Sequence, residues 1–319
     1  MRDVILVTGA TGFVGTALLP KLEAAFANAN IIGLSHQQFV KNASAHVSYQ
    51  SCDLADKQQV TQLINDIRPN YVINLAAISH IPTAFSQPDL TWDVNLYGVL
   101  NLLNALVSAD IACTFLQVGS GDCYGQSFAN GQRVDEETAF MPMNPYAASK
   151  AAADLAAFSY RQQGKLKVIR ARPFNHSGAG QSDNFVIPAF AKQIVNIEKG
   201  LQPAELTVGN LTAERCFLHV DDVVDAYIAL LLNQHIINSG EAFNIVCDEA
   251  SVIRSILDGL LAKSAQTITV LDDPAKQRPS DILRANGSAD KLKKLTQWQP
   301  KITIDQLLDD VLTYLRQEI

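Results

Sequence analysis

The chain reads VILVTGATGFVG at residues 4–15, a short apolar run followed by glycines at positions 9, 12 and 15. The run 4–7 is typical of a buried β-strand, and the residues from 15 to about 26 are typical of a helix. Glycines spaced G-x-x-G-x-x-G at such a junction let the backbone turn tightly and approach a pyrophosphate, while the third lets the helix pack closely on the strand. Three glycines can also be simple turn residues, but their position between a strand and a helix favours a dinucleotide-binding role, with the phosphates at the helix N-terminus.

Beyond this unit, apolar runs spaced as strands alternate with helical segments. Five runs are expected to be strands: 31–34, 47–50, 71–75, 112–118 and 168–172. The alternation predicts an α/β fold with a Rossmann-type doubly wound parallel sheet. After residue 178 helices are separated by short strand-like pieces. We therefore predict an NAD(P)-binding domain at residues 1–178 and a smaller C-terminal α/β substrate lobe at 179–319, with an interleaved boundary.

Composition and charge exclude several classes of protein. Of the 319 residues, 48% are apolar and 18% are charged, which suits one large core or a core with a smaller lobe. A net charge of −7 and a pI near 5.3 argue against a general binder of nucleic acid or anionic membranes. The apolar run at the start is too short for a signal peptide or a membrane span, and no later run is long enough.

The cysteines also bear on the compartment. They stand at positions 52, 113, 123, 216 and 247, an odd number without a C-x-x-C pair. We expect free thiols in a reducing cytoplasm, with neither a disulfide framework nor a metal site.

Two stretches bear on the cofactor. The segment 35–38, SHQQ, follows the second strand, where an acid normally binds the ribose 2′-hydroxyl of NAD. It contains neither an acid nor an arginine, so we expect NADP to be preferred only moderately over NAD. Asp53 follows the third strand, where its carboxylate can meet an adenine amine or cap the helix that starts near Asp56.

The stretch NPYAASK at residues 144–150 has the composition of a proton-transfer site. Tyr146 and Lys150 are four residues apart, which places them on one face of a helix. An ammonium beside a phenol favours the phenolate, and such a pair can exchange a proton with a hydroxyl or carbonyl oxygen. A surface tyrosine and a solvated lysine are the alternative. Ser120 and Asp122 follow one strand and Asn175 follows the next, so all could share one crevice at the carboxyl edge of the sheet.

Taken together, the glycine motif, Ser120 placed 26 residues before Tyr146, and Y-x-x-x-K resemble the extended short-chain dehydrogenase/reductase family, in its nucleotide-sugar branch. The segments 172–181, 190–194 and 208–215 are similar to the GDP-mannose subgroup, which includes GDP-mannose 4,6-dehydratases and GDP-4-keto-6-deoxy-D-mannose reductases. The overall pattern is closest to the reductases.

The resemblance implies three sets of site residues. The catalytic set is Ser120, Asp122, Tyr146 and Lys150. The cofactor set is Gly9, Thr11, Gly12, Phe13, Val14, Gly15, Ser35, His36, Asp53, Leu54, Leu75, Ala76, Ala77, Tyr146, Lys150 and Pro173. The substrate set is Ser79, Ser120, Asn175, Val186, Lys192, Asn210, Arg215 and Arg278, in which guanidinium groups suit phosphate oxygens.

The implied activity is NAD(P)H-dependent reduction of the 4-keto group of a GDP-4-keto-6-deoxyhexose, giving GDP-D-rhamnose or GDP-6-deoxy-D-talose. A 4,6-dehydratase or a 4-epimerase is the alternative enzyme. A cofactor-binding regulatory protein with a disabled site is the alternative of another class, and the intact Ser120, Tyr146 and Lys150 argue against it. Asp122 stands where the dehydratases and many reductases have Glu, and because Asp is one methylene shorter we expect no dehydration of GDP-mannose.

Two further departures from the family pattern are Gly121, in place of Ser, Thr or Asp, and Cys216, in place of Asp. The family pairs two helices across a twofold axis, so the resemblance also implies a homodimer. The apolar residues offered by these two helices are Leu96, Leu103, Val107, Ala152, Leu155 and Ala156.

Overall fold

The computed structural model describes residues 2–35, 47–276 and 282–319. Within them, seven parallel strands form one sheet in the order β11-β6-β5-β4-β1-β2-β3. Their bounds are β1 Val4–Thr8, β2 Asn30–Leu34, β3 Val47–Gln50, β4 Tyr71–Asn74, β5 Cys113–Val118, β6 Leu166–Pro173 and β11 Glu241–Ile245. The chain order runs outward from β1 in both directions, which creates a switch point between β1 and β4 where ligands of such sheets bind. The predicted doubly wound α/β fold is confirmed.

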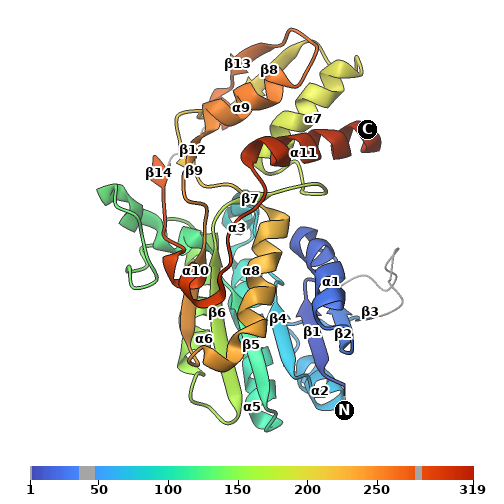
Figure 1. Ribbon diagram of the computed structural model, residues 1–319, viewed down its shortest axis with the longest axis vertical. Helices are drawn as coiled ribbons and strands as arrows, with labels where there is room; N and C mark the ends of the chain where they lie inside the picture. Colours follow the sequence, from blue (N-terminus) through green and yellow to red (C-terminus); the bar gives the residue numbers. More distant parts are fainter. Residues whose placement is uncertain (1, 36–46, 277–281) are drawn as a thin grey trace.

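Helices cover both faces of the sheet, so alternate strand residues enter two separate cores. Ile5 and Val7 pack with α1 (Phe13–Ala25) and α8 (Val220–Leu232) on one face. Leu6 packs on the other face, with a layer of three helices: α2 Lys57–Ile67, α5 Gly98–Ser108 and α6 Pro145–Ser159. Figure 1 shows α1 and α8 in front of the sheet and this layer behind it. A sheet buried on both faces explains why these strands read as continuous apolar runs.

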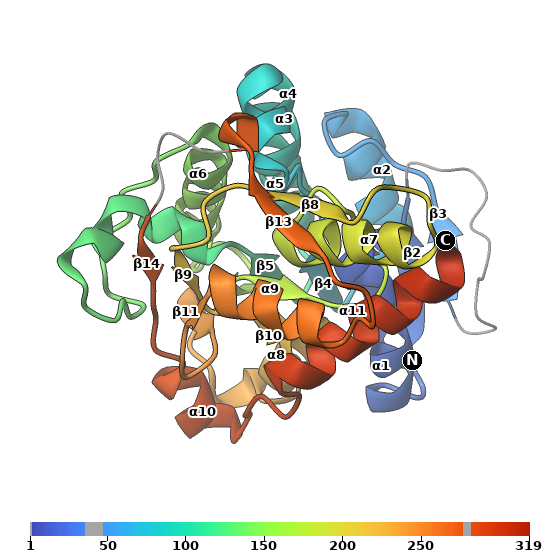
Figure 2. The same cartoon turned by 90° about the horizontal axis from the view of Figure 1, so that it is seen from above.

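A smaller lobe lies above the carboxyl ends of the strands (Figures 1 and 2). Its own core joins α7 (Val186–Glu198), α9 (Ile253–Ala262) and α11 (Ile304–Glu318). Beside them β8 (Glu205–Val208) pairs in parallel with β13 (Thr269–Asp272). Although α8 and β11 come after residue 178, they pack into the sheet layer, so the C-terminal part of the chain supplies elements of both units. The two-domain division itself stays a prediction.

The remaining elements are short. The two-residue strands are β7 His176–Ser177, β9 Glu214–Arg215, β10 Leu218–His219, β12 Ser251–Val252 and β14 Arg284–Ala285. The short helices are α3 Ile81–Ser86, α4 Pro88–Trp92, α10 Asp290–Thr296, η1 Asp93–Tyr97, η2 Gly121–Asn130, η3 Gln234–Ile236 and η4 Pro274–Lys276.

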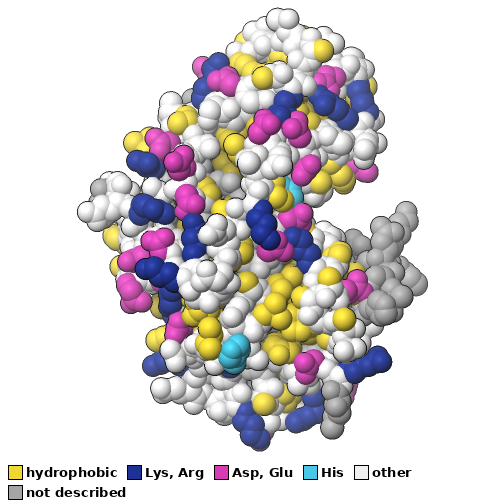
Figure 3. Space-filling model, viewed as in Figure 1, with side chains coloured by type: hydrophobic (Ala, Val, Ile, Leu, Met, Phe, Trp, Pro, Cys, Tyr) yellow, Lys and Arg dark blue, Asp and Glu magenta, His cyan; other side chains and the backbone are white. Residues whose placement is uncertain are grey.

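A hollow of about 480 Å³ lies between α11 and the first turns of α1 and α8. Figure 3 shows a notch between the lobe and the sheet layer, with acidic and basic side chains intermixed over this face.

The prediction of five free thiols was wrong for two of them. Cys216 and Cys247 form a disulfide, with Cα atoms 5.7 Å apart. The pairing joins the segment after β9 to the end of β11, two places that are distant in sequence, so local spacing carried no sign of it. Cys52, Cys113 and Cys123 are free and buried.

No helix among the described residues is long and apolar enough to cross a membrane. The same part of the chain holds no group of three or more His, Cys, Asp or Glu side chains placed to bind a metal.

Candidate active site

The loop between β1 and α1 is shaped by glycines. Gly9 has φ +64°, and a Cβ there would lie 2.9 Å from the backbone nitrogen of Ala76. A Cβ on Gly15 would lie 2.4 Å from the carbonyl oxygen of Gly9. Gly12 donates its N–H to that oxygen at 3.0 Å and begins α1 without a side-chain cap. The loop therefore fits a ligand that approaches the backbone closely and accepts hydrogen bonds from the first turn of α1.

The catalytic helix α6 begins where the sequence predicts. The Asn144 side chain accepts a hydrogen bond from the N–H of Ala147 at 2.8 Å, and Pro145 occupies the first turn. This cap places Tyr146 on the first turn and Lys150 one turn later. Lys150 is buried and donates from Nζ to the carbonyl oxygen of Val118 at 2.5 Å, so its charged end lies against the end of β5.

The structure brings the predicted catalytic residues together. The Ser120 side chain and the Asp122 charge both lie close enough to the Tyr146 phenol to act on its pKa. Ser120 begins η2 directly after β5, and its Oγ accepts a hydrogen bond from the N–H of Asp122 at 3.1 Å. Ser120, Asp122 and Tyr146 therefore meet at the carboxyl edge of the sheet, beside Lys150.

Burial changes the proton affinity of both central groups. Burial lowers the pKa of Lys150 to about 8, and the neighbouring Cys123 and Asp154 side chains only partly oppose this shift. Burial and the Asp122 charge raise the pKa of Tyr146, and the Ser120 side chain only partly opposes them. The net shift is therefore upward, opposite to the lowered pKa expected from an adjacent ammonium alone. A phenol with a raised pKa is protonated at neutral pH, which is the form that donates a proton.

Asn95 connects two parts of this edge. It is buried in the π-helical turn η1, where its Oδ1 accepts a hydrogen bond from the N–H of Ile78 at 2.8 Å. Its Nδ2 donates to Ser149 of α6 at 2.9 Å. The side chain thus joins the segment after β4 to the catalytic helix. Single π-turns often occur at functional sites, but no residue preference in the sequence reveals one.

His176 is a second residue that sequence reasoning did not place. Its ring is stacked on Phe13 of the glycine loop, with centroids 6.2 Å apart and planes 8° from parallel. Nδ1 lies 2.9 Å from the carbonyl oxygen of Phe174, and burial lowers the pKa of the imidazole. The neutral ring therefore donates from Nδ1 and presents Nε2 as an acceptor. The sequence could have placed His176 at this edge, because it directly follows the predicted site residue Asn175 at the end of a strand.

The adenosine end expected for the cofactor involves the ends of β2 and β3. Thr11 Oγ1 donates to Ser35 Oγ at 3.4 Å, which joins the glycine loop to the end of β2. Asp56 caps α2, while Asp53 Oδ1 accepts from the N–H of Ala55 at 2.9 Å. Asp53 is therefore not the helix cap, and its adenine role stays a prediction. His36 lies outside the described residues.

The other residues expected at the cofactor surround this loop. Thr8 Oγ1 accepts a hydrogen bond from the N–H of Ala76 at 3.1 Å, which fixes the chain after β4. Leu54 is buried beneath α5, and Pro173 is buried at the end of β6. Phe13, Val14, Leu75 and Ala77 are half-buried.

Comparison with known proteins identifies the chain. Residues 6–311 match the family described as GDP-mannose 4,6 dehydratase. The chain belongs to this GDP-mannose 4,6-dehydratase family. It is 36% identical over 314 residues to the GDP-6-deoxy-D-mannose reductase of Pseudomonas aeruginosa, covering 98% of this chain and 97% of that protein. It is 31% identical over 331 residues to GDP-mannose 4,6 dehydratase 1 of Arabidopsis thaliana, covering 96% and 88%. Among solved structures, the protein RMD from P. aeruginosa complexed with NADPH superposes with a TM-score of 0.85 at 33% identity, covering both chains fully.

One departure from the family pattern has a packing explanation. A Cβ on Gly121 would lie 2.6 Å from the ring of Phe174, which is buried beside Tyr124 and Phe128. A Cβ on Gly287 would lie 2.5 Å from the far end of the same ring. Phe174 therefore fills a slot between two glycines, and a larger residue at 121 has no space unless this ring moves.

The residues expected at the substrate come from both units. Ser79 and Asn175 follow strands of the sheet, whereas Val186, Lys192, Asn210 and Arg215 belong to the lobe. Lys192 forms an ion pair with Asp183 at 2.7 Å. This pairing favours an ordinary surface role for Lys192 over a substrate-binding one. Arg215 lies on β9 between β12 and β14. Arg278 lies outside the described residues, and all these roles stay predictions.

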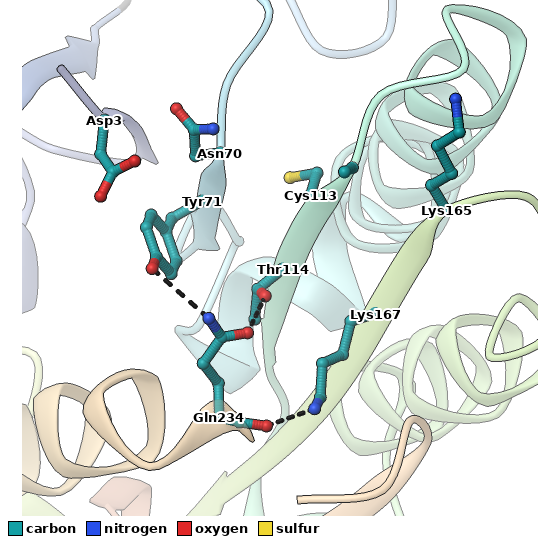
Figure 4. Close-up of a pocket in the computed structure, with 9 residues that line it drawn as sticks. Asp3, Asn70, Tyr71, Cys113, Thr114, Lys165, Lys167 and Gln234 are labelled. Carbon is teal, nitrogen blue, oxygen red and sulfur yellow. Dashed lines mark hydrogen bonds between the residues drawn. The ribbon is translucent and has the colours of Figure 1, made fainter. Parts of the chain in front are cut away.

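A second hollow lies at the opposite, amino-terminal edge of the sheet. It has a volume of about 300 Å³ and is lined by residues that include Tyr71, Thr114, Lys167 and Gln234. Figure 4 shows that Gln234 is hydrogen-bonded to the other three. Because its polar groups bond one another, and because ligands of doubly wound sheets bind at the carboxyl edge, we assign no ligand to it.

Proposed function

We propose that this protein is an NAD(P)H-dependent reductase of GDP-linked 4-keto-6-deoxy sugars, forming GDP-D-rhamnose or GDP-6-deoxy-D-talose. The observation that carries the proposal is the Ser120 side chain beside the Tyr146 phenol, one helical turn from the buried Lys150. The similarity to a named GDP-6-deoxy-D-mannose reductase supports the substrate class. The NADPH in the neighbouring solved structure supports the cofactor.

The glycine loop fits a nicotinamide dinucleotide, because side chains at Gly9 or Gly15 would collide with neighbouring backbone atoms and prevent the tight turn that places the first turn of α1 toward a pyrophosphate. The cofactor supplies a hydride to C4 of the sugar. Ser120 holds the sugar O4 by a hydrogen bond, and the protonated Tyr146 gives its proton to that oxygen as the C–H bond forms. The Lys150 ammonium then stabilises the phenolate left behind. The ketone gains one hydride and one proton and becomes a hydroxyl.

A 4,6-dehydratase is the second candidate, and the family match favours it. Dehydration needs a carboxyl group that takes the C5 proton and returns it to the departing 6-hydroxyl. Reduction needs no such group. A dehydratase regenerates its cofactor in each cycle, whereas a reductase consumes it.

The direct assay offers GDP-4-keto-6-deoxymannose with NADPH and follows the absorbance of the reduced cofactor. We expect consumption of NADPH equal to the sugar reduced, with the product configuration at C4 read by NMR. Absence of cofactor consumption with this substrate would contradict the proposal.

We predict a modest preference for NADPH over NADH. Ser35, the described end of the SHQQ segment, is hydrogen-bonded to Thr11, and the segment contains neither an acid for the 2′-hydroxyl nor an arginine for the 2′-phosphate. Without either group, the ratio of kcat/KM values should stay within about tenfold, or ~1.4 kcal/mol. The measurement is kcat/KM for both cofactors. A large preference for NADH would show that another group binds the 2′-hydroxyl.

We predict a homodimer built on the helices behind the sheet. Exposed apolar side chains gather on α3, α4, η1 and α6: Phe85 at 59%, Leu90 at 46%, Tyr97 at 54% and Leu155 at 57% exposure. Leu103 belongs to the chain's own core, so the expectation that it contributes to the interface was wrong. The patch is suited to a self-complementary contact.

By light scattering at micromolar concentration, the wild type should have twice the 34.7 kDa mass of one chain, whereas Leu155→Asp should have the 34.7 kDa mass of a monomer. Leu232→Asp is the control, because Leu232 is 52% exposed on α8, at the other face of the sheet. A wild-type mass of 34.7 kDa would refute the dimer.

We also propose a cytoplasmic location, since the expected substrate and cofactor are metabolites of that compartment.

A further inference from the structure

A buried carboxylate lies on the catalytic helix. Asp154 has no exposed surface and follows Lys150 by four residues and Tyr146 by eight. That spacing places all three side chains on one face of α6, which packs on β5 and β6 (Figure 1). The reaction proposed above assigns Asp154 no role, although burying a charge is costly unless strong partners compensate.

Two arginines of β6 are those partners. Arg172 forms a two-pronged contact, with Nε 3.0 Å from Asp154 Oδ2 and a terminal nitrogen 3.0 Å from Oδ1. Arg170 donates to Oδ1 at 2.5 Å. Forked contacts of this kind fix orientation as well as adding energy. Both arginines are nearly fully buried, so the cluster holds the angle of α6 on the sheet.

The cluster also contacts the loop that carries Ser120. A Cβ on Gly119 would lie 3.5 Å from Asp154 Oδ2 and 3.7 Å from Cγ of Arg172, so the backbone of Gly119 lies directly on this ion pair. Gly119 donates its N–H to the carbonyl oxygen of Ala171 at 2.7 Å. From the other side, the Lys150 ammonium donates a hydrogen bond to the carbonyl oxygen of Val118. The backbone just before Ser120 is therefore held between Lys150 and the Asp154–Arg172 pair.

Arg172 reaches further along the same loop. It donates to the hydroxyl of Tyr124 at 2.9 Å, and Tyr124 donates in turn to Asn244 of β11 at 2.7 Å. Tyr124 lies two residues after Asp122. The ion pair thus contacts the catalytic loop on both sides of Ser120 and Asp122.

The charges around Lys150 depend on Asp154. Cys123 of η2 faces Lys150, but burial raises the pKa of its thiol, which stays neutral. Arg170 and Arg172 of β6 bring two more positive charges to the cluster. Asp154 is therefore the carboxylate that contacts both arginines and acts on Lys150, and without it the Lys150 ammonium would be less stable.

We propose that Asp154 is a positioning residue: through Arg172 it fixes the Val118–Ser120 backbone against the Tyr146–Lys150 face of α6, and its charge keeps Lys150 in the ammonium form. This inference rests on the proposed use of Tyr146 and Lys150. It predicts that the negative charge at Asp154 determines the pH range of activity.

The test is Asp154→Asn, which keeps the side-chain size and removes the charge. In the wild type, kcat should fall as the pH rises through about 8, where Lys150 loses its proton. In the variant this falling limb should move down by about one pH unit or more, as expected for loss of an adjacent opposite charge. Activity lost at pH 7.5 should then return in part at pH 6. An unchanged limb, with activity lowered equally at every pH, would overturn the charge role.

A second variant covers the case in which Asp154→Asn does not fold. Arg170→Gln leaves the Asp154–Arg172 fork in place and removes one cation, so the limb should move to higher pH. A limb that stays in place or moves down would contradict the proposal. Asp258→Asn is the control, since it breaks an exposed ion pair with Arg254 and should change nothing.

The pH dependence of NADPH binding, followed by cofactor fluorescence, reads the same ionisation without a sugar substrate. If the wild type binds NADPH but reduces no GDP-4-keto sugar, the proposed function fails. The role of Asp154 can still be judged by comparing the pH at which NADPH binding weakens in Asp154→Asn with that in the wild type.

Discussion

Tyr146→Phe is expected to remove turnover while leaving cofactor binding nearly unchanged. The variant loses the phenol that lies beside Ser120 and is proposed to give the proton to the sugar oxygen, but it keeps the ring that packs at the start of α6. General acid catalysis is worth ~10²–10⁴-fold, and kcat should fall within that range. The measurement is kcat with the 4-keto substrate, together with the dissociation constant for NADPH.

Tyr160→Phe is the matched control. Tyr160 ends the same helix, and its hydroxyl donates to Asn104 at 2.7 Å on the surface. Its loss should leave kcat within about twofold, since surface substitutions usually change stability by less than about 0.5 kcal/mol. If Tyr146→Phe kept more than half of the wild-type rate, Tyr146 would not be the acid.

The second large effect is expected for Gly9→Ala. The new methyl group would lie 2.9 Å from the nitrogen of Ala76 and 3.1 Å from the carbonyl carbon of Leu75. Both are backbone atoms, so no side-chain rotation can relieve the collision. Overpacking of this kind costs about 1–3 kcal/mol, and relief of it would move the loop away from the cofactor. The dissociation constant for NADPH should therefore rise about tenfold or more, since ~1.4 kcal/mol corresponds to tenfold.

Gly164→Ala separates this contact from backbone strain. Gly164 has φ +59°, close to the +64° of Gly9, but a Cβ there would meet no atom within 4 Å. The control shares the conformational penalty and lacks the collision, so NADPH binding should be unaffected. Equal effects of both substitutions, or no effect of Gly9→Ala on binding, would show that the loop does not hold the cofactor.

The sequence was most informative where structure is local. The glycine spacing and the interval between Tyr146 and Lys150 each depend on one turn of chain, so pattern and geometry agree. The meeting of Ser120 with Tyr146 was also predictable, because a parallel sheet brings the carboxyl ends of neighbouring strands to one edge.

What the sequence did not show depends on contacts between distant segments. The raised pKa of Tyr146 follows from burial and from Asp122, neither of which its spacing from Lys150 reveals. The Cys216–Cys247 pair crosses from the segment after β9 to the end of β11, and an odd number of cysteines argued against it. The ion pair of Asp154 with Arg172 joins a helix to a strand that follows it, and nothing in the segment that begins at Arg172 predicts Asp154 as its partner.

The central claim is that this site reduces a ketone and does not create one. The most direct test gives one enzyme preparation two substrates: GDP-4-keto-6-deoxymannose with NADPH, and GDP-mannose with catalytic NADP⁺. We predict rapid oxidation of NADPH in the first reaction and no 4-keto-6-deoxy product in the second, because Asp122 is one methylene shorter than the Glu that dehydratases use and catalytic geometry is intolerant of about 1 Å. Formation of the 4-keto-6-deoxy sugar from GDP-mannose at a rate comparable to ketone reduction would contradict the account and make the protein a dehydratase.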